Sequence, residues 1–197
     1  MSDDPIVIVG MARTPMGGFQ GDLSDVKAPQ LGSIAIEAAM SRAGVTGEDI
    51  DEVIMGCVLP AGLGQAPARQ ASFGAGIPDS VGCTTVNKMC GSGMRAAMYG
   101  FDALMAGSNN IVVAGGFESM TNAPYILPKM RTGLRLGHGE VKDHMFLDGL
   151  EDAYEEGRLM GSFAEETAGL YQFTREAQDS YAIESLKRAK QATEDGS

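Results

Sequence analysis

The chain has 197 residues, of which 44% are hydrophobic and 21% are charged, a balance typical of globular proteins and too apolar for a disordered chain. Its 15 lysines and arginines stand against 26 aspartates and glutamates, which gives a formal net charge of −11. This acidity argues against a nucleic-acid-binding protein and against attachment to an anionic membrane surface, and no apolar run reaches the roughly 18 residues of a membrane-spanning helix.

Strand and helix patterns alternate over the first 116 residues. In chain order, we expect a strand at 5–10, a helix at 29–43, a strand at 52–59, a helix at 66–75, a strand at 84–86, a helix at 91–105 and a strand at 110–114. The apolar side of the helix at 91–105 is expected to face the core, and it consists of Met94, Ala97, Met98, Phe101, Leu104 and Met105. The alternation favours an α/β layer with a largely parallel sheet.

Local signals mark where helices begin and end. Gly44 is expected to cap the C-terminus of the helix at 29–43, and Thr46 with Asp49 matches a capping box. The composition changes after residue 116, and the turn-rich stretch 117–150 shows no strand pattern.

Two more helices are expected in the last part of the chain. Ser162 with Glu165 matches a capping box and predicts a helix that ends near residue 173, and Thr174 predicts the cap of a second helix that ends near residue 193. The second helix has an apolar face made of Ala177, Tyr181, Ala182, Ile183 and Leu186. Because such a face needs a packing partner, we expect this helix to belong to a larger fold.

The most informative segment for chemistry places Cys90 between a short strand and a helix. The start of a helix carries unsatisfied N–H groups and about half a positive charge, and both favour a thiolate. Gly91 and Gly93 leave room for a substrate carbonyl to approach the backbone, and the main-chain N–H of Cys90 is a candidate oxyanion donor. This is the layout of an activated nucleophile at a strand-to-helix turn.

The cysteines also have a purely structural interpretation, which the local sequence leaves open. The local sequence of Cys90 also fits a buried cysteine that packs as a small hydrophobic residue. Cys57 and Cys83 fit this packing role better still. Ser92 is expected to satisfy backbone N–H groups in the first turn of the helix. Three cysteines are too few for a disulfide scaffold, and residues 1–4 lack the start of a signal peptide, so we expect a cytoplasmic protein without a zinc site.

Short blocks in a fixed order along nearly the whole chain resemble the N-terminal half of the thiolase family. They include Ala-Arg-Thr-Pro at 12–15, Val-Asn-Lys-Met-Cys-Gly-Ser-Gly at 86–93 and Ala-Gly-Gly-Phe-Glu-Ser-Met at 114–120, with further blocks at 51–56, 64–70, 123–125, 160–161 and 175–179. The resemblance implies a layered αβαβα fold made of two similar halves. Residues 1–118 would form the N-terminal α/β domain that carries the nucleophile, and residues 119–197 would form the first part of an inserted loop domain.

The resemblance also implies an activity, acetyl-CoA C-acetyltransferase. Cys90 would accept an acyl group from a coenzyme A thioester, which is a substrate, so no resident cofactor is implied. A second acetyl-CoA would then attack in a Claisen condensation, and coenzyme A would attack in the reverse thiolysis. Leu150 and Met160 match positions that border the pantetheine and acyl pocket, and Leu159 stands where many thiolases carry histidine.

The family's other catalytic motifs do not occur in this sequence. They are Gly-His-Pro, which supplies the histidine that activates the nucleophile, Asn-Glu-Ala-Phe, and Cys-x-Gly-Gly-Gly, which supplies a second cysteine. Because groups that act as a unit lose most of their rate when one is missing, we expect the chain to be inactive alone. It should need a complementary C-terminal half, in a homo- or hetero-oligomer.

Two other interpretations remain open at this stage. One is a non-catalytic interaction or regulatory protein derived from a thiolase, and the other is a related condensing enzyme of the ketoacyl synthase type. A locally basic group in the stretch 117–150 is expected either to steer polyanionic coenzyme A or line a subunit contact, or to be a solvated loop. Its members are Lys129, Arg131, Arg135, His138, Lys142 and His144.

Overall fold

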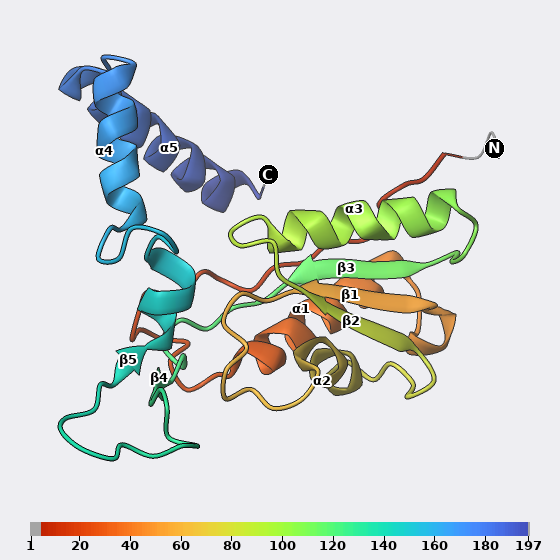
Figure 1. Ribbon diagram of the computed structural model, residues 1–197. Coiled ribbons are helices and arrows are strands. Elements are labelled where there is room, and N and C mark those ends of the chain that lie inside the picture. The colour runs from red at the N-terminus through yellow and green to blue at the C-terminus, as the bar shows by residue number, and fades with distance from the viewer. Residues whose placement is uncertain (1–4, 197) are drawn as a thin grey trace. The chain divides into compact units, whose positions relative to one another are not determined.

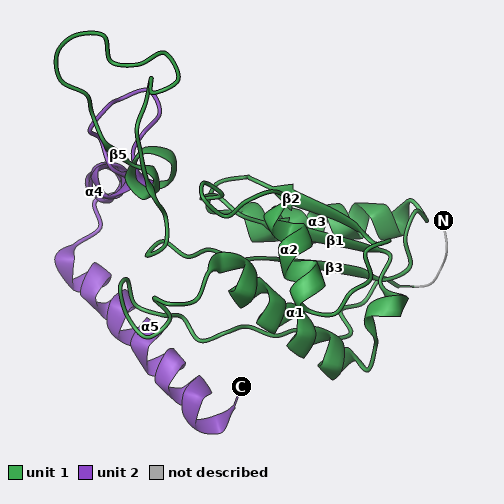
Figure 2. Ribbon diagram, turned by 90° about the horizontal axis from the view of Figure 1, so that it is seen from below, with its two compact units in different colours: residues 1–149 green, residues 150–197 purple. Residues whose placement is uncertain are grey.

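The computed structural model describes residues 5–196, which belong to two compact units, residues 1–149 and residues 150–197 (Figure 2). Residues 1–4, on which the expectation about a signal peptide rests, lie outside the described residues. The predicted division at residue 118 comes from the family resemblance and stays a prediction. None of the helices in the described part of the chain is long and apolar enough to cross a membrane.

A three-stranded parallel sheet forms the centre of the first unit (Figure 1). Its strands are β1 (Glu52–Gly56), β2 (Gly82–Val86) and β3 (Val112–Gly116), in the order β2-β1-β3. The middle strand is buried from Val53 to Gly56, as expected for a parallel strand covered on both faces. The register places Gly56 beside Val86 on one side and Gly116 on the other, so the three strands end together.

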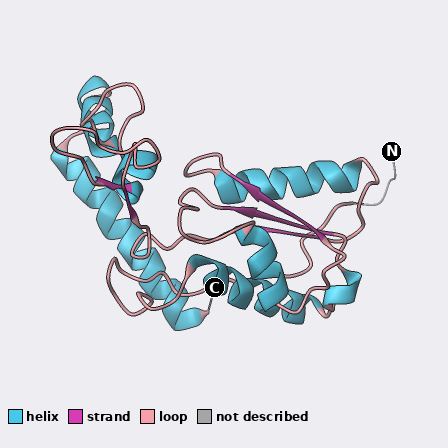
Figure 3. Ribbon diagram, turned by 60° about the horizontal axis from the view of Figure 1, so that its bottom comes forward, coloured by secondary structure: helices cyan, strands magenta, loops and turns pink. Residues whose placement is uncertain are grey.

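Helices cover both faces of this sheet, which confirms the predicted α/β layering. α1 (Ala28–Ala43) packs on α2 (Pro67–Gly74) on one side, and α3 (Ser92–Met105) lies on the other (Figures 1 and 3). The buried core lies on the α1 and α2 side of the sheet, and α3 contributes no residue to it. Its members include Ile36, Met40, Val53, Met55 and Phe117.

The predicted direction of α3 is wrong. Its bulky apolar side faces away from the sheet: Met94 is 75% exposed, and Ala97, Met98, Phe101 and Met105 are exposed as well. The residues that α3 buries are small, because the helix lies close to the strands: a Cβ at Gly100 would be 3.2 Å from Cγ1 of Val112. The helical period was predicted correctly, but the small residues face the sheet.

The predicted strand at 5–10 is also wrong. These residues are extended but join no ladder, and Ile8 is 86% exposed. Gly10 lies directly on α1, where a Cβ would be 2.5 Å from the carbonyl oxygen of Ala39. β-branched residues favour an extended backbone, yet a strand also needs a neighbour with free hydrogen-bonding groups. Within the described residues, this segment has no such pairing.

Short-range signals were more reliable. Gly44 has a φ of 70° and ends α1, as predicted. Thr46 and Asp49 form the expected capping box at the start of η1 (Gly47–Asp49), with the Thr46 N–H donating to Asp49 Oδ2 at 2.8 Å. The stretch 117–150, where no strand was expected, contains a two-residue antiparallel pair, β4 (Tyr125–Ile126) and β5 (Lys142–Asp143).

A short helical turn, η2 (Phe146–Leu150), precedes the two helices of the second unit, α4 (Met160–Leu170) and α5 (Arg175–Asp195). Thr174 caps α5 as predicted, since its hydroxyl accepts the N–H of Ala177 at 3.2 Å. The capping box predicted at Ser162 is wrong, because α4 begins two residues earlier. Arg158 stabilises that earlier start: its guanidinium pairs with Glu155 and Glu166 and stacks on the ring of Phe163.

The hydrogen bonds of the Asp51 carboxylate predict how the stability of the fold depends on pH. Its carboxylate accepts the N–H groups of Asn110 at 2.6 Å and Ile111 at 3.0 Å just before β3, and these bonds lower the pKa of Asp51. A lowered folded-state pKa stabilises the fold above the ordinary carboxyl value of about 4 and loses this effect as the pH falls through the folded value. We expect Asp51→Asn to lower the urea midpoint at pH 7.

The difference between wild type and Asp51→Asn should shrink as the pH falls below the ordinary carboxyl value of about 4, because the wild-type carboxyl is progressively protonated. Urea unfolding followed by circular dichroism over this pH range measures it. Asp22→Asn, which makes the same change at an exposed carboxylate, serves as the matched control. A deficit that is the same at every pH would contradict the electrostatic explanation.

Candidate active site

The structure places Cys90 on an exposed turn between a parallel strand and a helix. β2 ends at Val86 and α3 begins at Ser92, so only five residues connect them. Met89, directly before the cysteine, has a φ of 50°, which a non-glycine residue adopts only when its surroundings impose it. The turn therefore presents Cys90 at the C-terminal end of the sheet, where ligands of open α/β proteins bind.

Ser92 fixes this turn from below. Its Oγ accepts the N–H of Lys88 at 2.8 Å and donates to the carbonyl of Met89 at 2.6 Å, and the residue is buried. On the outer side, Asn87 Oδ1 accepts the N–H of Met89 at 2.9 Å. The expectation that Ser92 satisfies backbone groups is thus confirmed, and the hydroxyl is unavailable as a second nucleophile.

Glycines allow the start of α3 to rest directly on the ends of the strands. A Cβ at Gly56 would lie 2.5 Å from the carbonyl carbon of Ser92, closer than real Cβ contacts allow. A Cβ at Gly116 would lie 3.2 Å from the Gly56 carbonyl oxygen and 3.3 Å from the Cα of Gly93. β1, β3 and α3 therefore meet backbone to backbone beneath the turn that carries Cys90.

The other two cysteines pack in the protein, as expected. Cys57 is 2% exposed, and its thiol donates to Glu118 Oε1 at 3.4 Å. Burial, followed by the negative charge of Glu118, raises the pKa of Cys57 to about 12, so this thiol stays protonated at neutral pH. Cys83 is half-buried and donates to the carbonyl of Val81 at 3.5 Å. Of the three thiols, the fold exposes Cys90 alone.

Comparison with known protein families identifies the family of the chain. A family model described as thiolase, N-terminal domain, matches residues 6–197. The chain belongs to the thiolase family. Acetyl-CoA acetyltransferase 2 of Arabidopsis thaliana is 54% identical over 191 residues, which are 97% of this chain and 47% of that protein.

Two further relatives of this thiolase domain show the same partial overlap. Acetyl-CoA acetyltransferase ERG10, cytosolic, of Gibberella zeae is 50% identical over 192 residues, 98% of this chain and 48% of that protein. The acetyl-CoA acetyltransferase of Cupriavidus necator is 50% identical over 191 residues, 97% of this chain and 48% of that protein. The chain spans about half the length of these curated relatives.

The predicted acyl-pocket residues lie in the second unit of the thiolase domain or at its boundary. An isolated antiparallel bridge pairs Glu151 with Leu159, so that Leu150 precedes one partner of the bridge and Met160 follows the other. Leu150 is half-buried and Met160 is exposed. Their role in binding an acyl group stays a prediction.

The basic group of the stretch 117–150 is mostly a solvated loop. Lys129, Arg131, Arg135 and His138 are exposed, while His144 is buried. Lys142 lies 3.7 Å from Glu140 in an ion pair. A role in steering coenzyme A stays a prediction for these residues.

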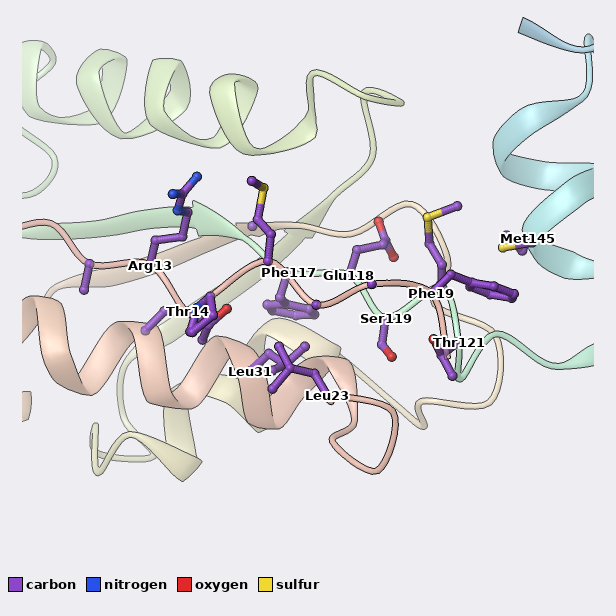
Figure 4. Close-up of a pocket in the computed structure, with 18 residues that line it drawn as sticks. Arg13, Thr14, Phe19, Leu23, Leu31, Phe117, Glu118, Ser119, Thr121 and Met145 are labelled. Carbon is purple, nitrogen blue, oxygen red and sulfur yellow. The ribbon is translucent and has the colours of Figure 1, made fainter. Parts of the chain in front are cut away.

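No sequence motif predicted the cavity shown in Figure 4. It has a volume of about 650 Å³ and lies between residues 12–19, α1 and residues 116–121. Its wall is mainly apolar, with Phe19, Leu31 and Phe117 among the contributors. Gly116 belongs to the wall of the cavity and Cys90 does not. The cavity therefore reaches the place where Gly116 contacts the start of α3, and it does not include the Cys90 thiol.

The differences in thiol environment predict an order of alkylation. In the native chain, we expect iodoacetamide to modify Cys90 first, Cys83 more slowly, and Cys57 only on unfolding, because a buried protonated thiol is a poor nucleophile. Peptide mass spectrometry over a time course measures the order. In denaturant the three rates should become similar, which is the control. Modification of native Cys57 as fast as Cys90 would contradict the structure.

Ser92→Ala tests the internal support of the turn. The substitution removes both hydrogen bonds of the buried hydroxyl, to the N–H of Lys88 and to the carbonyl of Met89, which should lower the free energy of unfolding by about 1–3 kcal/mol. Chemical denaturation measures the loss. Ser108→Ala, at an exposed position past the end of α3, is the matched control and should change stability by less than about 0.5 kcal/mol. Equal effects of the two substitutions would be evidence against the support role.

Proposed function

We propose that this chain is the nucleophile-bearing part of an acetyl-CoA C-acetyltransferase. One observation carries the proposal: Cys90 is the exposed thiol on a strained, internally braced turn at the end of a parallel sheet. The relatives of the chain named as acetyl-CoA acetyltransferases support the assignment of acetyl-CoA as substrate. Coenzyme A enters as part of the substrate, and no resident cofactor is proposed.

The proposed reaction has two steps. The Cys90 thiolate attacks the thioester carbonyl of acetyl-CoA, and the carbon–sulfur bond to coenzyme A breaks as the S-acetyl bond forms. A second acetyl-CoA, deprotonated at its methyl carbon, attacks the acetyl group, which releases acetoacetyl-CoA and restores the thiolate. Thiolysis is the reverse. A covalent intermediate divides one difficult step into two easier ones, and the Cys90 N–H is the candidate donor to the oxyanion.

The base for this reaction is proposed to come from a complementary half. Among the described residues, no hydrogen bond joins the Cys90 thiol to a titratable side chain. The family resemblance implies that a histidine and a second cysteine stand in motifs that this sequence lacks. That half either continues the same polypeptide or is a separate chain.

The exposed side of α3 supports the need for such a half. Met94, Met98, Phe101 and Met105 recur at helical spacing on the same side of the helix, and all are exposed. A contiguous apolar surface of this kind is rare on a soluble monomer and marks an interface. We therefore propose that the complementary half covers α3 and brings its base to the neighbouring turn that carries Cys90. A cytosolic location is proposed from the name of the Gibberella zeae relative.

Acyl trapping tests the proposed function in the assembly with the complementary half. Incubation with radiolabelled acetyl-CoA should label one peptide, the one that contains Cys90, and Cys90→Ala should abolish the label and lower thiolysis by roughly a thousandfold or more. Cys83→Ala, which replaces a half-buried thiol outside the turn, is the matched control and should retain both. The 197-residue chain alone should show no turnover.

Undiminished thiolysis by Cys90→Ala would overturn the proposal. A labelled peptide that contains another residue would overturn the assignment of the nucleophile. An assembly in which wild-type Cys90 takes no label would favour the non-catalytic descendant of a thiolase.

A further inference from the structure

A buried histidine outside the turn that carries Cys90 has hydrogen-bond partners that select one of its protonation states. His144 lies between β5 and η2, and its side chain is only 7% exposed. Its Nδ1 is 2.6 Å from Asp148 Oδ2, and its Nε2 faces the N–H of Ala61 at 3.4 Å. Asp148 is an acceptor and the Ala61 N–H is a donor. The ring therefore meets one partner of each kind.

Only one form of the imidazole satisfies both partners. With a proton on Nδ1 and a lone pair on Nε2, the ring donates to Asp148 and accepts from Ala61. The other neutral tautomer would place two acceptors face to face at Asp148. The cation would place an N–H on Nε2 against the N–H of Ala61, so that contact would change from a hydrogen bond to a repulsion between donors.

The contact with Ala61 joins two parts of the chain that are 83 residues apart in sequence. Ala61 belongs to the turn that follows β1, and the same turn donates the N–H groups of Val58 and Leu59 to Glu118 at 2.8 and 2.9 Å. His144 is anchored on its own side by its N–H bond to the carbonyl of Pro124 at 3.1 Å. The segment 117–149 thus holds this turn through a carboxylate at one end and an imidazole at the other.

We propose that His144 is a proton-sensitive clamp: its neutral Nδ1–H form ties residues 117–149 to the turn after β1, and protonation of Nε2 releases the Ala61 end of that turn. Release affects the cavity described above, because the next residue, Met145, belongs to the cavity wall. The proton on Nε2 comes from solvent, and no other covalent bond is made or broken. The proposal does not depend on the acetyltransferase function.

The titratable groups on the segments that hold the ring are mainly carboxylates. They are Asp148, half-exposed on η2, whose Oδ2 is 2.6 Å from Nδ1, Asp143, which accepts the N–H of Met145, and Glu118, which accepts the N–H of Val58 in the turn after β1. The turn at 57–63 carries no titratable side chain except Cys57, and the segment 122–126, which packs on His144 through Pro124, carries only Tyr125.

Nuclear magnetic resonance of the intact chain tests the clamp directly. At about pH 8, above the range in which histidines titrate, the imidazole nitrogen spectrum should show His144 protonated on Nδ1 and unprotonated on Nε2. Between about pH 8 and pH 5, hydrogen-exchange protection of the Ala61 amide, corrected for intrinsic rates, should fall at least about tenfold. The Leu59 amide of the same turn is the internal control, because its acceptor is the Glu118 carboxylate and not the imidazole.

A His144→Gln variant separates this clamp from a general effect of pH. Glutamine presents an amide oxygen to Ala61 and does not titrate in this range, so Ala61 protection should become independent of pH. His138→Gln, at an exposed histidine of the same segment, is the matched control and should keep the wild-type response. If His144→Gln does not fold, the tautomer of the wild-type ring still decides. An Nε2–H tautomer, or equal pH responses of Ala61 in the wild type and in His144→Gln, would overturn the proposal.

Discussion

The position of Cys90 depends on a contact between backbones. The first residues of α3 rest on the ends of β1 and β3, and the missing side chains of Gly56 and Gly116 make this approach possible. With α3 so close to the strand ends, the chain leaving β2 has to reverse within a few residues, which is why Met89 adopts a left-handed conformation. The buried hydroxyl of Ser92 then offsets the strain with two hydrogen bonds. Because the strand ends and Ser92 fill the space beneath the turn, Cys90 lies on its exposed side.

Glu118 plays the same organising role for the neighbouring turn. Its carboxylate accepts two main-chain N–H groups and the thiol of Cys57, so a charge near the core has partners for both of its oxygens. These bonds take the N–H groups of Val58 and Leu59, which explains why β1 ends at Gly56 although the apolar pattern continues to residue 59. Burial, and after it the negative charge of Glu118, keep Cys57 protonated. One carboxylate thereby ends a strand and adds to the burial that leaves this thiol unreactive.

Sequence reasoning worked best where the signal and its cause are neighbours in the chain. Gly44, Thr46 and Thr174 each cap an element within a few residues, and each was predicted correctly. The site was partly predictable for the same reason, since a cysteine between a strand and a helix is a local pattern. The left-handed conformation of Met89 was not, because a non-glycine residue adopts it only under the pressure of distant packing. The bonds of Glu118 and His144 join positions about 60 and 83 residues apart and leave no periodic trace.

The wrong predictions about burial have a common cause. Ile8 and the bulky side of α3 have the apolar patterns of a core, and the described residues leave both exposed. A periodic pattern states that one face will be covered, without stating by what. For α3 the sheet already takes the small residues Ala96 and Gly100, so the large ones need a second layer on their other side. A helix that is apolar on two sides is a central helix, and its sequence already contains the requirement for a partner layer beyond it.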